Sequence, residues 1–412
     1  MDYSLIKKIS DIYGDSFYVF QRDVLRKNYF EMSRAFASIY SNTVIGYSFK
    51  TNYTPAICRE LLALGCYAEV VSAMEVDLAL KLNPSSPNII FNGPCKTYES
   101  IKSVLNVGGI VNLDSLNDFK LAKEVVDAEN IDNARLGLRC NFLMKDSDST
   151  YFPDSRFGID VNSHDFKDIV YALSKSKNMS LISLHCHLPY RSLDSFRERV
   201  KNIFELVERF DLNQLEFLNF GGGMYGPMPK ELAVQMEGTI PNYFDYAEVI
   251  GQAMAKKFSP EDGPGIIIEP GTALVADVFD FYTQIVSTKK IRKTNVAIVS
   301  GSIFDIATNS RSTALPYEVL EKPIQKSPDD EEKWKIVGYT CIESDILTAR
   351  HDGILHIGDF IQYKNVGSYS IVMRPPFIKP SFAIIEIEGQ QIKCIKKQQS
   401  FNTVFNDFSF DA

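Results

Sequence analysis

Long apolar runs, basic clusters and paired cysteines are all missing from this 412-residue sequence. No stretch approaches the roughly 18 consecutive apolar residues of a membrane span, and the start, MDYSLIKKISDIYGDSF, lacks the apolar core of a signal peptide. We therefore expect a cytoplasmic protein without a membrane partner. The formal net charge of -8 and the lack of a Lys/Arg block argue against a nucleic-acid partner and favour a small-molecule substrate. The seven cysteines include no CxxC pair, which disfavours a disulfide framework and a structural zinc site.

What the sequence does have is a repeated alternation of strand-like and helical segments between about residues 23 and 274. The apolar run TVIGYSF precedes PAICRELLALG, in which apolar residues recur at helical spacing and a glycine ends the segment. About eight such strands follow one another, which is the number that a (β/α)8 TIM-type barrel requires. An open doubly wound sheet is the competing interpretation, although no Gly-x-Gly-x-x-Gly follows the first strand.

After about residue 275 the helical rhythm stops, and short strand-like segments separated by turns begin. Examples are FDFYTQIVSTKKI, TNVAIVSGS and SFAIIEIEG. Near the N-terminus, FYVFQRDVL is also strand-like and could pair into the same module. We therefore expect a cofactor-binding barrel over residues 23–274 and an all-β domain formed by residues 1–22 together with residues 275–412.

Polar residues lie where the barrel strands are expected to end, which is the edge where barrel enzymes carry their catalytic groups. Lys50 ends VIGYSFK, and a lysine in a low-dielectric pocket can form a Schiff base with a carbonyl; the alternative is a lysine whose head reaches solvent. Glu269 in IIIEPGT would be costly to bury without a partner, and a protonated pyridine nitrogen would supply one; the alternative is a solvated carboxylate. Arg139 ends ARLGLR at the same edge.

Two further motifs end expected strands. The glycines of NFGGGMYG, Gly221, Gly222 and Gly223, let a backbone approach a phosphate and point N–H groups at it, although such a run is as often a mere tight turn. His185 and His187 in LISLHCH face the same side of a strand, but no carboxylate or third histidine lies at supporting spacing, so we expect no metal site. We expect one histidine to be a satisfied core residue and the other to stack on a planar cofactor.

Together these motifs resemble the fold-type III pyridoxal-phosphate-dependent decarboxylases, the family of diaminopimelate, ornithine and arginine decarboxylases, over nearly the whole chain. YSFKTN resembles the family's Tyr-Ala-x-Lys-Ala-Asn, VVSAMEVDLAL its serine and glutamate motif, and FNGPCKT and SRFGID also match in kind. The resemblance implies pyridoxal 5'-phosphate as cofactor, with Lys50 as the Schiff-base lysine and His187 stacked on the ring. It also implies that Gly221 to Gly223 hold the phosphate and that EPG places Glu269 on the ring nitrogen, with Gly271 among the cofactor contacts.

The second domain carries the remaining elements of the resemblance. GYTCIESD resembles the family's Gly-Pro-x-Cys element, which implies that Cys341 is the proton donor. GDFIQYKNVGSYS resembles the Gly-Asp…Gly-Ala-Tyr element, which implies that Tyr369 contacts the phosphate. In that family these residues complete the other subunit's site, so the resemblance implies a homodimer with shared active sites. We expect Arg139, Glu343 and Asp345 to contact the amino-acid substrate.

The departures from the family pattern bear on the substrate. EPG is followed by Thr272 where the family has Arg, and Pro189 with Tyr190 replace Gly-Ser after the histidine motif. The acid that usually follows the cysteine is replaced by Ile342 and moved to Glu343, and a one-residue shift turns a side chain to the other face of a strand. The expected activity is therefore a diaminopimelate-decarboxylase-like reaction, with an unusual amino acid from a secondary pathway as a possible substrate.

Two other functions fit the same fold. An amino-acid racemase would share the barrel, the lysine and the β domain, but it needs a second base on the opposite face, usually a tyrosine, and GYTCIESD favours decarboxylation. A non-catalytic binding relative should have lost Lys50, Glu269 or Cys341, and all three are present.

Overall fold

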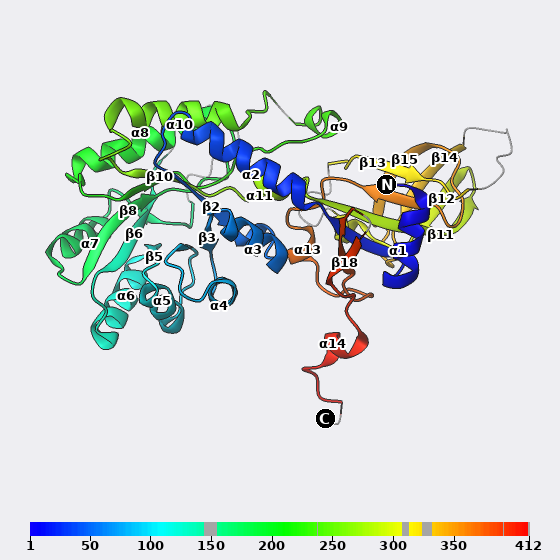
Figure 1. Ribbon diagram of the computed structural model, residues 1–412, viewed down its shortest axis with the longest axis horizontal. Helices are drawn as coiled ribbons and strands as arrows, with labels where there is room; N and C mark the ends of the chain where they lie inside the picture. Colours follow the sequence, from blue (N-terminus) through cyan, green and yellow to red (C-terminus); the bar gives the residue numbers. More distant parts are fainter. Residues whose placement is uncertain (144–154, 237, 307–312, 324–331, 390, 411–412) are drawn as a thin grey trace. The chain divides into compact units, whose positions relative to one another are not determined.

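The computed structural model describes the chain except residues 144–154, 237, 307–312, 324–331, 390 and 411–412. The chain divides into two compact units. The barrel unit comprises Arg26–Pro227 and Thr239–Leu274, and the β unit comprises Met1–Leu25, Met228–Gly238 and Val275–Ala412 (Figure 1). No helix in the described part of the chain is long and apolar enough to cross a membrane.

The barrel unit contains eight parallel strands that close into a ring. Each strand pairs with the next in the order of the chain, and the last pairs with the first. The strands are β2 (Thr43–Ser48), β3 (Tyr67–Val70), β4 (Ile89–Phe91), β5 (Ile110–Leu113), β6 (Ala134–Asn141), β8 (Met179–His185), β9 (Phe217–Asn219) and β10 (Gly265–Ile268). A short β7 (Ile159–Asp160) pairs with the end of β6. The predicted (β/α)8 barrel is therefore confirmed, and the open-sheet alternative is wrong.

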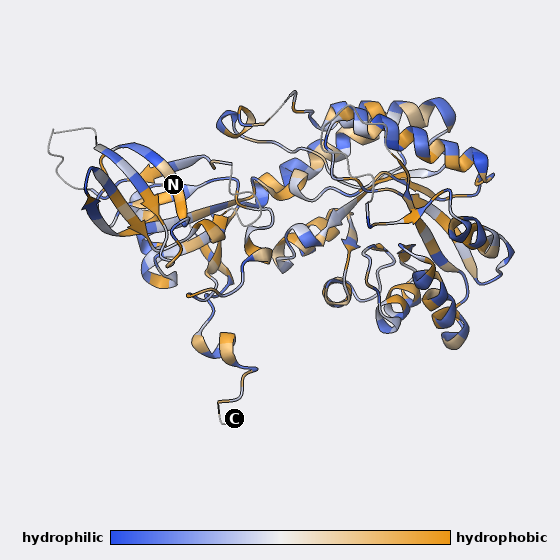
Figure 2. Cartoon of the chain, turned by 180° about the vertical axis from the view of Figure 1, so that it is seen from behind, coloured by the Kyte–Doolittle hydropathy of each residue, from blue (hydrophilic) through white to orange (hydrophobic). Residues whose placement is uncertain are grey.

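Helices surround this ring (Figure 1). The helical elements of this part of the chain are α2 (Arg22–Ala37), the 3-10 turn η1 (Phe49–Thr51) at the end of β2, α3 (Pro55–Ala63), α4 (Ala73–Leu82), α5 (Tyr98–Asn106), α6 (Leu116–Glu129), α7 (His164–Lys175), α8 (Leu193–Arg209), α10 (Tyr243–Lys257) and the short α11 (Thr272–Val275) after β10. Polar side chains cap several helix N-termini by accepting backbone N–H groups, as Ser72 does for α4 and Ser192 for α8. Figure 2 shows these helices banded between hydrophilic and hydrophobic, as expected of helices with one buried face. Inside the ring, Ile90, Ile110, Ile182 and Ile267 form a packed cluster.

The β unit is built on a mixed sheet in the order β15-β14-β12-β11-β1-β17-β18, with β16 pairing β11 and β13. Its strands are β1 (Ser16–Phe20), β11 (Phe279–Ile291), β12 (Thr294–Val299), β13 (Tyr317–Leu320), β14 (Glu332–Val337), β15 (Ile346–Gly353), β16 (Phe360–Tyr363), β17 (Ala383–Glu388) and β18 (Gln391–Lys396). The N-terminal β1 lies between β11 and β17, as the sequence predicts. The helices here are α1 (Tyr3–Tyr13), α9 (Lys230–Ala233), α12 (Ile303–Ile306), α13 (Ser370–Met373) and α14 (Phe401–Phe405). An all-β domain is thus present, with short helices added.

Candidate active site

Lys50 lies at the carboxyl end of β2, in the one-turn η1. Its neighbours Phe49 and Thr51 are buried, whereas the lysine side chain is 33% exposed. Its Nζ donates a hydrogen bond to Oε2 of Glu69, which is fully buried on β3, at 2.5 Å. A partly buried lysine is expected to need a partner, and the carboxylate of Glu69 is that partner.

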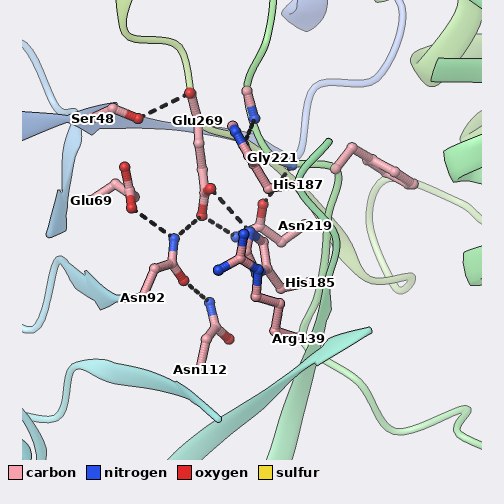
Figure 3. Close-up of polar contacts among 12 residues, drawn as sticks. Ser48, Glu69, Asn92, Asn112, Arg139, His185, His187, Asn219, Gly221 and Glu269 are labelled. Atoms are coloured by element: carbon pink, nitrogen blue, oxygen red, sulfur yellow. Dashed lines mark hydrogen bonds and ion pairs between the residues drawn. The ribbon is translucent and has the colours of Figure 1, made fainter. Parts of the chain in front are cut away.

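Asn92, directly after β4, connects Glu69 to a second buried carboxylate, that of Glu269 (Figure 3). Its Nδ2 donates to Oε1 of Glu69 at 2.9 Å and to Oε1 of Glu269 at 2.8 Å. Its Oδ1 accepts from Nδ2 of Asn112, on β5, at 2.7 Å. Hydrogen bonds therefore run without a break from Lys50 through Glu69 and Asn92 to Glu269.

Glu269 follows β10 and is 2% exposed. Besides the bond from Asn92, its Oε1 accepts from Nδ2 of Asn219 at 2.7 Å, and its Oε2 lies 3.1 Å from Nε2 of His185 (Figure 3). Burial by itself raises the pKa of Glu269, but His185, with further help from Lys50 and Asn92, lowers the pKa below the ordinary value for a glutamate. The carboxylate therefore stays ionised in the interior of the barrel.

His187 lies beside the glycine loop that follows β9. Its Nδ1 accepts a hydrogen bond from the backbone N–H of Gly222 at 3.0 Å, so the neutral ring carries its proton on Nε2. Burial and the positive charges of Lys50 and Arg199 lower the pKa of His187 well below its usual value. His187 is therefore a neutral ring with a fixed orientation, and His185 is the buried histidine with a carboxylate partner.

The glycine loop needs residues without side chains. Gly221 and Gly223 have φ values of +66° and +84°, which favour glycine. A Cβ added at Gly222 would come within 2.2 Å of the carbonyl oxygen of Glu269, so the loop packs directly against the segment that carries the acid. The N–H of Glu269 also donates to the carbonyl of Gly221 at 2.9 Å. Gly271 is equally confined, since a Cβ there would lie 2.0 Å from Oγ1 of Thr51.

Arg139 is 8% exposed at the end of β6 and is held by an ion pair. Its Nη1 donates to Oδ1 of Asp114 at 3.0 Å, and its guanidinium lies 4.5 Å from the ring centre of Phe157. Oδ1 of Asp114 also accepts the N–H of Gly158 at 3.1 Å. These contacts give Arg139 a part in holding the loops, and its expected contact with the substrate stays a prediction.

In the β unit, the segment Gly338–Asp345 carries the expected proton donor and two expected substrate contacts. Cys341 and Glu343 are exposed, whereas Asp345 is 2% exposed. Oδ1 of Asp345 accepts from Oγ of Ser302 at 2.9 Å and from the N–H of Ile303 at 2.8 Å, and its Oδ2 accepts from Oγ1 of Thr340 at 2.6 Å and from the Thr340 N–H at 3.1 Å. Asp345 thus anchors the loop that presents Cys341, which differs from the substrate contact expected from the sequence.

Tyr369 adopts a left-handed conformation, with φ at +60°, just before α13. Bulky residues rarely do so, because the conformation costs about 1–2 kcal/mol, and such outliers concentrate at functional sites. Gly367, two residues earlier, could not be replaced without movement, since a Cβ there would lie 1.8 Å from the carbonyl oxygen of Val275. The turn that holds Tyr369 is therefore closely packed.

Four polar residues of the barrel site were missed in the sequence: Glu69, Asn92, Asn219 and Arg199. Three of them sit within or directly after a barrel strand, in the position that singles out Lys50 and Glu269, so the same reasoning could have found them. Arg199 lies on α8, on the face that also carries Phe196, Val200 and Ile203, and its signal was a charged residue at an apolar helical position.

A closed parallel barrel whose mouth holds a paired lysine, an ionised buried acid and a glycine loop is an arrangement typical of pyridoxal-dependent barrel enzymes. Residues 24–276 match the family model described as "Pyridoxal-dependent decarboxylase, pyridoxal binding domain". The chain belongs to this family. It is accordingly a pyridoxal-phosphate-dependent enzyme that decarboxylates an amino acid, and the racemase and non-catalytic alternatives are not favoured.

Similar proteins agree with this assignment. Diaminopimelate decarboxylase of Methanocaldococcus jannaschii is 27% identical over 383 residues, which cover 89% of this chain and 84% of the relative. The same enzyme of Aquifex aeolicus is 24% identical, covering 97% of this chain and 93% of the relative. Among solved structures, the M. jannaschii enzyme superposes with a TM-score of 0.85 at 22% identity, over 98% and 94% of the two chains. The arginine decarboxylase of Paramecium bursaria Chlorella virus has a TM-score of 0.74 at 17% identity, over 93% and 100%, so both structures support the fold.

The residues present fit pyridoxal phosphate. Oε2 of Glu269 has one hydrogen-bond partner within the described residues, although a carboxylate oxygen can take two, so it retains capacity for a pyridinium N–H. Lys50 supplies an amine that is partly exposed, and the glycine loop offers closely packed backbone without side chains. These three groups match the ring nitrogen, the aldehyde and the phosphate of the cofactor.

Proposed function

We propose that this chain decarboxylates an amino acid that carries a second amine at its far end, as diaminopimelate does, with pyridoxal phosphate held by Lys50. The observation that carries the role of Lys50 in this proposal is the hydrogen-bonded path from Lys50 through Glu69 and Asn92 to Glu269. An amine must lose its proton to act as a nucleophile, and Glu69 is placed to orient Nζ of Lys50 and to accept that proton. The same path joins this lysine to the acid that would meet the ring nitrogen.

When bound, the cofactor supplies the electron sink that stabilises negative charge at the substrate's Cα. Glu269, ionised and buried, would hold the proton of the ring nitrogen in place, because its pKa is lowered. His187, neutral and fixed by Gly222, would cover one face of the ring. The exposed thiol of Cys341 would return a proton to Cα.

We further propose that Cys341 and Tyr369 act in the site of a second copy of the chain. The strained backbone of Tyr369 supports a functional position, and Tyr369 would contact the phosphate. Glu343, exposed two residues after the cysteine, would meet the distal amine of the substrate. Arg139 is paired with Asp114, so the acidic Glu343 is the better candidate for selecting the far end of the substrate. A cytoplasmic location is part of this proposal.

Covalent attachment tests the role of Lys50. The purified protein is incubated with pyridoxal phosphate, reduced with borohydride and digested, and the modified peptide is located by mass spectrometry. We expect the label on Lys50, its loss in Lys50→Ala and its retention in Lys120→Ala, which changes an exposed lysine of α6. Labelling that persists in Lys50→Ala would sink the assignment.

Release of carbon dioxide tests the substrate. Meso-diaminopimelate, L-lysine, L-ornithine, L-arginine and L-alanine are offered to the wild type and to Glu343→Gln. We expect release from an amino acid with a distal amine, and an increased KM for it in Glu343→Gln. Turnover of L-alanine alone, or racemisation without release, would contradict the proposal.

Subunit complementation tests the shared site. Lys50→Ala and Cys341→Ala are each expected to lose activity, and their mixture is expected to regain about a quarter of the wild-type activity, since half of the dimers are mixed and each has one intact site. A mixture that stays inactive after subunit exchange, verified with differently tagged chains, would contradict the proposed sharing.

A further inference from the structure

Arg199 is a cation enclosed in the barrel unit, and among the described residues it has no acidic partner. It lies on α8, its exposed fraction is 0%, and it is among the largest fully buried side chains of the described residues. Within that part of the chain, no ion pair joins it to a carboxylate. Burial lowers its pKa to about 10, which still leaves it charged at neutral pH. A buried charge is costly unless something compensates it, so the partner of Arg199 needs an explanation.

The guanidinium makes four hydrogen bonds, all to backbone carbonyl groups of two loops. Nη1 donates to the carbonyls of Phe220 and Gly222 at 3.0 and 2.7 Å. Nη2 donates to those of Leu188 and Tyr190 at 2.9 and 2.8 Å. One loop is the glycine loop after β9, and the other follows His187 after β8. Arg199 therefore links these two loops to each other.

These bonds also determine where the glycine N–H groups point. No cis peptide bond occurs in the described residues, and in a trans peptide the C=O and the following N–H point in opposite directions. Because Arg199 holds the carbonyl of Gly222, the N–H of Gly223 points away from the guanidinium. The N–H of Gly221 donates to Oδ1 of Asn219, and the N–H of Gly222 donates to Nδ1 of His187. The N–H of Gly223 has no hydrogen-bond partner among the described residues.

We propose that Arg199 is the positioning residue of the phosphate site, which directs and polarises the Gly223 N–H toward the cofactor's phosphate and supplies the positive charge behind it. A hydrogen bond from a charged donor to a carbonyl polarises the whole peptide group, so its N–H becomes a better donor. The phosphate would in turn be the anion that compensates the buried guanidinium. Thr272, after EPG, brings no charge to this region, so Arg199 would add a positive charge there beside that of Lys50.

The inference rests on the proposed cofactor, and the test separates phosphate binding from general damage. Dissociation constants are measured for pyridoxal phosphate and for pyridoxal, which lacks the phosphate, by absorbance titration of wild type, Arg199→Met and Arg197→Met. Arg197 is exposed on the same helix and pairs with Asp194, so it is the matched control. We expect Arg199→Met to weaken binding of pyridoxal phosphate roughly tenfold or more, while pyridoxal binding changes little. Arg197→Met should bind both compounds as the wild type does.

Equal weakening of both compounds in Arg199→Met would overturn the inference and leave a merely structural role. A wild type that binds neither compound would instead refute the cofactor assignment. If circular dichroism shows that Arg199→Met does not fold, Arg199→Lys is used, because it keeps the charge but loses the fork that spans the two loops. In that variant the 31P resonance of the bound cofactor should shift and titrate at a higher pH than in the wild type. An unchanged resonance in Arg199→Lys, with unchanged affinity for pyridoxal phosphate, would also overturn the inference.

Discussion

Asn92 donates to both buried carboxylates of the site, and replacing it by leucine removes both bonds. The two lost bonds, to Glu69 and Glu269, are 2.9 and 2.8 Å long and involve acidic acceptors. Hydrogen bonds to charged groups contribute about 1.5–3 kcal/mol each, so Asn92→Leu should destabilise the barrel unit by about 3–6 kcal/mol. With a slope of about 3 kcal/mol per molar urea, the unfolding midpoint should fall by about 1–2 M.

The chain offers separate signals for its two units. Its only tryptophan, Trp334, lies on β14 of the β unit, whereas most helical residues belong to the barrel unit. Far-UV circular dichroism should therefore show the loss of barrel stability, and tryptophan fluorescence should follow the β unit. Asn112→Leu is the matched control, because it removes only the neutral bond to Oδ1 of Asn92 and should cost about 1 kcal/mol.

The pH dependence of the Asn92→Leu effect has a definite sign. The bond from Asn92 is one of the contacts that lower the pKa of Glu269 in the folded state, so its loss should move this pKa back toward the ordinary value. A lowered pKa contributes stability that is present above the unfolded value and lost as the pH falls, so the deficit of Asn92→Leu should be larger at pH 7 than at pH 3. A circular-dichroism midpoint within about 0.3 M of the wild type, which corresponds to less than about 1 kcal/mol, would refute the reasoning.

Three further perturbations probe other parts of the structure. Burial raises the pKa of Glu75 to about 7, above its ordinary value of 4.5, so between these values the folded state loses stability as the pH rises. The free energy of unfolding, measured with urea, should therefore fall by about 3 kcal/mol more between pH 5 and pH 8 in the wild type than in Glu75→Gln, and equal losses would contradict this. Gly222→Ala should weaken pyridoxal phosphate binding by more than about tenfold, because the new methyl group would meet the Glu269 carbonyl, and an unaltered titration curve would show that the loop can yield. Cys341→Ser should keep cofactor affinity but lose most carbon dioxide release, whereas Cys95→Ser, at another exposed thiol, should lose none; equal activities would remove Cys341 from the reaction.

The fold was predictable because most barrel strands are apolar runs followed by a helical segment. The regular rhythm from TVIGYSF onward is produced by strands buried on both faces, which leave an uninterrupted apolar signal. Elements outside this rhythm were missed: α1 near the N-terminus and α7 after the long loop were not expected. Each owes its place to tertiary packing, as when Ile6 and Ile9 of α1 join the core formed by Phe17 and Tyr282.

The site was predictable where a residue type has distinctive chemistry, as for Lys50, Glu269 and the three glycines. It was not predictable where the contact joins strands far apart in the sequence. Asn92 reaches Glu269, 177 residues away, only because the barrel closes. The two acids of CIESD could not be told apart in this way, because the sequence does not show which of the Glu343 and Asp345 side chains is buried. The structure buries Asp345, and the bonds that Ser302 and Ile303 donate to it explain why.

The charges of the barrel site also bear on how a cofactor would enter it. The acidic end is formed by Glu269 with Glu69, and the cationic end by Arg199 behind the glycine loop. The two ends are joined by backbone, because the N–H of Glu269 donates to the carbonyl of Gly221. Pyridoxal phosphate has a basic ring nitrogen at one side and an anionic phosphate at another, so a site with this asymmetry favours one orientation and opposes the reverse by repulsion at both ends. The negative charge of Glu269 would also repel a substrate carboxylate, so the substrate would not compete with Glu269 for the ring nitrogen.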